Sequence, residues 1–169
     1  MLKILAKIFI KNPDDYGNPM VRSAYGVLCG AFGIFWNLLL FAGKIIGGLI
    51  ISSVAMIADA LNNLSDAASS LVQILGFKLA SKKPDPEHPF GHGRFEYIAG
   101  LIISFLILLM GFELMKSSVT ALIHPEPVEF NPVALVIMGC AILVKFYMYL
   151  YNHRIAKKIK SVSMEATAK

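Results

Sequence analysis

Residues 52–79 read SSVAMIADALNNLSDAASSLVQILGFKL, and the fold depends on whether this stretch crosses a lipid bilayer. Polar side chains recur within it at intervals of three or four residues, and this polar stripe consists of Asp59, Asn62, Asp66, Ser69 and Gln73. On an α-helix that spacing puts them on one face, while the opposite face is apolar. Such a helix can cross a membrane when its polar face meets protein or water and not lipid. We therefore expect a membrane-spanning helix near 53–81.

The composition favours a membrane protein independently of this stretch. Of the 169 residues, 56% are hydrophobic and 16% are charged. A soluble domain carries about a quarter charged residues and somewhat under half apolar ones. A single core cannot bury this surplus, because a chain of this length leaves roughly a third of its surface in water. Two cysteines exclude a secreted disulfide-rich scaffold.

Three further apolar runs, at 27–51, 98–115 and 133–151, approach or exceed the roughly 20 residues that a spanning helix needs. The last begins after Asn131, a good N-cap, and Pro132, which is tolerated at the first helical position. Together with the polar stripe they predict an all-α membrane bundle of four helices, near 22–50, 53–81, 95–123 and 132–160. We expect a transmembrane domain over 22–160 and a cytoplasmic tail over 161–169.

Basic residues test this count. Thirteen of the 16 Lys and Arg residues lie before the first helix, beside the link between the second and third, or after the fourth. The other two links, 51–53 and 124–131, contain none. By the positive-inside rule, both termini and the 82–94 loop are cytoplasmic in a multi-pass protein of the cell membrane. The same sorting explains the net charge of +5 without a nucleic-acid partner.

The first 21 residues form a cytoplasmic N-terminal segment. Lysines alternate with apolar residues over 1–10, so we expect no cleavable signal peptide there. An amphipathic segment lying on the inner leaflet and a frayed basic tail both fit this pattern.

An ionised carboxylate within the membrane costs roughly 2.5–3.5 kcal/mol on insertion scales. A cation, a proton or a basic partner such as Lys44 or Lys145 must therefore offset the charge of Asp66. Asn62 lies one turn before Asp66, and their oxygens suit hard divalent ions if another helix completes the shell. Because an amide cannot titrate, any proton exchange in this half-site falls to Asp66. Interhelical hydrogen bonding is the simpler role for Ser69, Ser70 and Gln73.

The predicted cytoplasmic loop, KKPDPEHPFGHGRFE over 82–96, contains a second group of ligand types. Asp85, His88 and His92 offer one carboxylate and two imidazoles, a combination that suits zinc-like ions. Its prolines and glycines exclude a helical pair of histidines. A polar loop with helix-capping histidines explains the spacing equally well.

Three motifs in combination identify a resemblance. They are IADALNNLSD at 57–66, PDPEHPFGHGRFE at 84–96, and the run from Gly111-Phe112-Glu113 to His124-Pro125. The chain resembles the cation diffusion facilitator family of divalent metal exporters. The resemblance implies a Y-shaped homodimer that exchanges cytoplasmic metal for external protons by alternating access.

The resemblance also implies roles for individual residues. Asn62 and Asp66 match the family's intramembrane metal ligands, and Asp59 matches a common aspartate that is not usually counted as one. Asp85, His88 and His92 match the loop positions that bind a second metal in some members.

Two features set this chain apart within the family. Asn62 is similar to the manganese- or iron-leaning branches more than to the zinc exporters, which carry histidine there. We therefore favour Mn²⁺ over Fe²⁺ or Zn²⁺ as the transported ion, with no cofactor. The family has six helices and a cytoplasmic α/β domain, and two of its ligands come from helix five. We expect that these 169 residues are the transmembrane part of a longer protein and do not transport alone.

Two other classes of function remain open at this stage. One is a membrane-embedded metallohydrolase that uses His88, His92 and Glu96, although the sequence offers no convincing general base beside the metal. The other is a non-catalytic membrane adaptor whose polar stripe only packs helices. We expect a transporter and not an enzyme.

Overall fold

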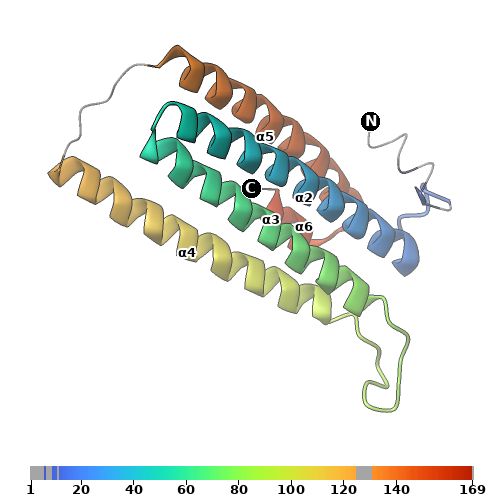
Figure 1. Ribbon diagram of the computed structural model, residues 1–169. Coiled ribbons are helices and arrows are strands. Elements are labelled where there is room, and N and C mark those ends of the chain that lie inside the picture. Colours follow the sequence, from blue (N-terminus) through green and yellow to red (C-terminus); the bar gives the residue numbers. More distant parts are fainter. Residues whose placement is uncertain (1–5, 7–8, 11, 125–130, 169) are drawn as a thin grey trace.

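The computed structural model describes residues 6, 9–10, 12–124 and 131–168, and this part of the chain is helical without strands (Figure 1). Its helices are α2 (Pro19–Ile50), α3 (Val54–Ala80), α4 (Phe95–Ile123), α5 (Pro132–Ile159) and the short α6 (Val162–Thr167). The four long helices begin and end within three residues of the predicted bounds. The prediction of an all-α helical bundle is confirmed.

Local sequence explains where the long helices begin. The side chains of Asn18, Ser53 and Asn131 each accept a hydrogen bond from a backbone N–H in the first turn of α2, α3 and α5. Proline follows Asn18 and Asn131 at the first helical position, where its missing N–H has no intrahelical partner to lose. These caps satisfy donors that the start of a helix leaves unpaired.

The long helices lie side by side in the order α5, α2, α3, α4 (Figure 1). Glycines on α2 allow α3 to approach closely. A Cβ atom on Gly26, Gly30 or Gly33 would lie 2.2–2.6 Å from side-chain atoms of α3, far inside normal contact. The short helix α6 packs against α4, α5 and α3.

The buried apolar residues gather at the end of the bundle where α2 begins and α5 ends. They include Tyr25 and Cys29 of α2, Phe77 of α3 and Ile159 of α5. Most large apolar side chains of α4 and α5 are instead exposed, as expected for helices that face lipid.

Three helices, α2, α4 and α5, are long and apolar enough to cross a membrane, which supports a multi-pass membrane protein. α3 is not among them, because its polar stripe lowers its hydropathy. Its 27 residues nevertheless reach about 40 Å at a rise of about 1.5 Å per residue, and it packs between two candidate spans. We therefore retain the interpretation that α3 is the fourth crossing.

Residues 161–168, which we expected to belong to a cytoplasmic tail, form a short helix packed on the bundle. Ser161 caps α6, and Ser163 and Met164 are fully buried against the long helices. Most of the predicted amphipathic stretch at the start of the chain lies outside the described residues. Ala6 and Ile10, which the structure does describe, are buried in the apolar cluster.

Candidate metal site

The polar stripe of α3 faces a cavity of about 800 Å³. All four long helices and α6 contribute to its wall, and each of the five stripe residues lines it. The structure therefore confirms that Asp59, Asn62, Asp66, Ser69 and Gln73 share one face of α3, and this face lines the cavity.

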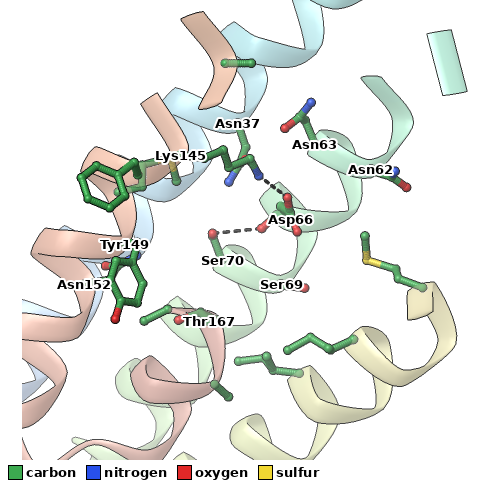
Figure 2. A pocket seen from close by; sticks show the side chains of 18 of the residues that line it. Asn37, Asn62, Asn63, Asp66, Ser69, Ser70, Lys145, Tyr149, Asn152 and Thr167 are labelled. Carbon is green, nitrogen blue, oxygen red and sulfur yellow. Dashed lines mark hydrogen bonds and ion pairs between the residues drawn. The ribbon is translucent and has the colours of Figure 1, made fainter. Parts of the chain in front are cut away.

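The carboxylate of Asp66 has a basic partner within the cavity. Its carboxylate forms an ion pair with the ammonium group of Lys145 on α5. The same ammonium donates a hydrogen bond of 2.9 Å to the side-chain oxygen of Asn37 on α2. Figure 2 shows the side chain of Lys145 reaching from α5 to a position between Asn37 and Asp66. A cation, a proton or a basic partner was expected to offset the charge of Asp66, and the structure shows a basic partner, Lys145.

Asn62 lines the cavity and is partly exposed, but its amide points away from the Asp66 carboxylate (Figure 2). Both residues lie on the predicted face, one turn apart. A metal ion shared by the two would therefore need the Asn62 side chain to rotate.

Asp59 has its own partner. Its carboxylate lies 2.6 Å from the Nζ atom of Lys44, whose side chain is only 7% exposed. The sequence offered Lys44 as one possible partner of Asp66, and the structure pairs it with Asp59 instead. Asp59 is therefore engaged in an ion pair about two turns from Asp66.

The hydrogen-bonding role expected for the small polar residues is right in one case and wrong in two. Gln73 donates to the carbonyl oxygen of Gly26 at 3.0 Å and accepts from Thr167 at 2.7 Å, so it joins α3 to α2 and α6. Ser69 and Ser70 instead donate to carbonyl oxygens of α3 four residues earlier, at 3.2 and 3.0 Å. A hydroxyl in a helix can satisfy itself this way without reaching a neighbour.

Sequence reasoning missed three asparagines of the cavity, Asn37, Asn63 and Asn152. Asn37 and Asn63 are each 2% exposed, and Asn63 donates to the carbonyl oxygen of Asp59 at 3.2 Å. Asn37 was visible as a lone polar residue in an apolar run, which is the signal that intramembrane polar groups carry. Asn63 lies one position off the 3–4 spacing, so the stripe did not include it.

The loop residues Asp85, His88 and His92 come together outside the helices. One ligand atom from each lies within 4.8 Å of the other two. The carboxylate of Asp85 lies 3.2 Å from Nδ1 of His88 and 3.4 Å from Nε2 of His92. Ligands held at about 2.1 Å in a tetrahedral shell are about 3.4 Å apart, so the spacing fits a zinc-like ion.

Local geometry explains how this loop brings its ligands together. The backbone N–H of His88 donates to the Asp85 carboxylate at 2.7 Å, which closes a turn. Gly91 follows with φ of +81°, a conformation that favours glycine. His92 is buried against the ring of Phe95, and its Nδ1 atom has no hydrogen-bond partner within the described part of the chain.

The electrostatics of the loop follow from the same contacts. Partial desolvation raises the pKa of Asp85, but hydrogen bonds from the backbone and ring of His88, and the charges of both histidines, outweigh it. The pKa of Asp85 therefore lies below its usual value. Glu96, the third residue of the alternative hydrolase site, forms an ion pair with Arg22 at 3.2 Å.

Comparison with known proteins gives the family. Residues 31–169 match the cation efflux transmembrane domain. The chain belongs to the cation diffusion facilitator family. The predicted resemblance is confirmed over the transmembrane part of the family's fold.

Several curated relatives of this family are similar to the chain. It is 36% identical over 135 residues to an uncharacterized transporter of Methanocaldococcus jannaschii, covering 80% of this chain and 48% of that protein. It is 34% identical over 131 residues to the manganese efflux system protein MneS of Bacillus subtilis, covering 78% and 45%. It is 32% identical over 142 residues to the magnetosome protein MamM of Magnetospirillum gryphiswaldense, covering 83% and 44%. The chain thus spans about half the length of these relatives.

Proposed function

We propose that the protein exports a divalent metal ion from the cytoplasm across the cell membrane in exchange for protons. Mn²⁺ is the favoured ion, ahead of Fe²⁺ and Zn²⁺, and the protein acts as a homodimer. The observation that carries this proposal is the Asp66 carboxylate, which faces a cavity of about 800 Å³ between candidate membrane spans. A carboxylate at such a place is a functional group by default, because an idle one would only destabilise the helix.

The donor atoms support a hard ion. Asp66 and Asn62 offer carboxylate and amide oxygens to the cavity, and the described residues that line it include no histidine. Oxygen ligands favour Mn²⁺ or Mg²⁺-like ions, whereas imidazole would favour zinc. A relative at 34% identity is named as a manganese efflux protein, which agrees with this choice.

The distribution of basic residues supports the orientation of the bundle in the membrane. The start of α2, the end of α3, the start of α4 and the end of α5 lie at one end of the bundle (Figure 1). That end contains Arg22, Lys78, Arg94 and Lys157, so we assign it to the cytoplasm. The Asp85, His88 and His92 cluster belongs to the same end, and we propose that it binds a second metal ion on the cytoplasmic side.

Export of Mn²⁺ from lipid vesicles containing the full-length protein tests the proposal. We expect Asp66→Asn to abolish Mn²⁺ flux and Asn62→Ala to weaken it. Asp15→Asn is the matched control, because Asp15 is an exposed carboxylate before α2 that does not line the cavity. We expect His92→Ala to remove the loop site without removing the ion from the cavity. Wild-type flux in Asp66→Asn would refute the proposed function.

A further inference from the structure

Two lysines lie inside the bundle, and each pairs with an aspartate of the polar stripe. Lys44 pairs with Asp59, and Lys145 pairs with Asp66. From this geometry we infer that Lys145 is a tethered cation that occupies Asp66 when no metal ion is bound and that an arriving metal ion displaces it. The inference rests on the proposed function, in which Asp66 binds the metal.

The two ion pairs differ in the exposure of their lysines, because the Asp59 carboxylate, at 44%, is about as exposed as that of Asp66. The side chain of Lys44 is 7% exposed, as expected for a group fixed in the packing of the helices. The side chains of Lys145 and Asp66 are 39% and 38% exposed. An ion entering the cavity can therefore reach the Asp66–Lys145 pair and compete for its carboxylate.

The charges lining the cavity make this competition necessary. Asp59 and Asp66 contribute two negative charges, and Lys44 and Lys145 contribute two positive charges, so the cavity has no net charge to attract a cation. Lys145 Nζ contacts the Oδ2 atom of Asp66, so a divalent ion that binds both carboxylate oxygens must displace the ammonium group. Lys145 is the group that can move, because its side chain is 39% exposed whereas that of Lys44 is 7% exposed.

Asn37 provides a position for the displaced ammonium group. Its side-chain oxygen already accepts a hydrogen bond of 2.9 Å from Lys145 Nζ, and Asn37 itself is 2% exposed. An ammonium group that leaves Asp66 while keeping this bond stays beside the metal. The positive charge of the ammonium group then weakens metal binding by repulsion. When the metal ion leaves, the ammonium group returns to Asp66. Lys145 thus weakens metal affinity and promotes release.

The size of the effect on metal affinity depends on the fraction of empty molecules in which Lys145 occupies Asp66. If Lys145 occupies Asp66 in nine of ten empty molecules, the apparent affinity for the metal is reduced about tenfold. Removing the ammonium group should therefore tighten binding while slowing turnover. A residue that only held the helices together would weaken binding when removed.

The test is Mn²⁺ binding by calorimetry and Mn²⁺ export by the full-length protein in lipid vesicles. We expect Lys145→Gln to lower the Kd for Mn²⁺ about tenfold and to lower the kcat of export. Lys145→Arg retains the charge, so its Kd should equal or exceed that of the wild type. Lys44→Gln removes the same charge from the same cavity, and its Kd should change much less. An unchanged or raised Kd in Lys145→Gln overturns the inference, and so does an equal drop in both glutamine variants.

A measurement on the wild-type protein covers the case in which Lys145→Gln does not fold. Acetylation of lysine amines, followed by mass spectrometry, should increase at Lys145 on addition of Mn²⁺ and stay constant at Lys44. Constant labelling at Lys145 would overturn the inference. Asp66→Asn separates the two hypotheses: retained Mn²⁺ binding at the cavity would refute the proposed function itself, whereas lost binding with no gain in Lys145→Gln would refute only the role of Lys145.

Discussion

The contact between α3 and α4 at Gly76 yields the sharpest structural prediction. A Cβ atom added at Gly76 would lie 2.3 Å from the Cβ atom of Ala99, which is buried at 4% exposure. Carbon atoms pack at about 3.5–4.0 Å, so Gly76→Ala requires a local separation of about 1.2–1.7 Å. Ala99 has no alternative rotamer, so the helices themselves must move apart.

Overpacking of this kind costs about 1–3 kcal/mol. At about 2–4 °C per kcal/mol for a chain of this size, the Tm should fall by about 2–12 °C. The assay is thermal unfolding of the purified protein in detergent, followed by circular dichroism.

Two variants make the reasoning refutable. A Cβ atom at Gly111 of α4 would meet nothing within 4 Å, so Gly111→Ala should unfold at or above the wild-type temperature. Ala99→Gly in the Gly76→Ala background removes the clashing atom and should restore most of the lost stability. If Gly76→Ala and Gly111→Ala unfold at the same temperature, the close packing of α3 on α4 described above is wrong.

Two further variants test a helix start and a buried hydrogen-bonding group. Asn131→Ala removes the acceptor of a 2.9 Å hydrogen bond from the Val133 N–H, and it should lower stability by about 1 kcal/mol in the same thermal assay; an unchanged Tm would show that this cap is unimportant. Gln73→Leu leaves the Gly26 carbonyl and the Thr167 hydroxyl without their present partner, at about 1–3 kcal/mol for each group that stays unsatisfied. We expect faster amide hydrogen exchange in α6 of that variant, and wild-type exchange there would contradict the role of Gln73.

The sequence predicted the long helices because each has a local cause. Apolar runs of sufficient length predicted α2, α4 and α5, and the cap at Asn131 marked the start of α5, whereas the caps at Asn18 and Ser53 were not predicted. The polar stripe was also predictable, since a spacing of three and four places side chains on one face in any helix. The loop cluster follows the same logic, because the turn that joins Asp85 to His88 is local.

What the sequence left open depends on contacts between distant residues. Lys145 and Asp66 are 79 positions apart, and no spacing rule indicates which lysine reaches which aspartate. The same is true of α6, whose packing depends on helices far from it in the sequence. Ser69 and Ser70 show the opposite failure, since their hydroxyls bond to their own helix where a contact with a neighbour was expected.

The central claim is that a divalent metal ion binds the Asp66 carboxylate inside the membrane-spanning bundle. The most direct test is the position of Mn²⁺ in crystals of the full-length protein, located by its anomalous scattering. We expect an anomalous peak about 2.0–2.6 Å from a carboxylate oxygen of Asp66, the range for hard cations bound to oxygen. We also expect the Lys145 ammonium group to have moved away from Asp66. A peak at the Asp85, His88 and His92 cluster alone, with Lys145 still paired to Asp66, would contradict the central claim.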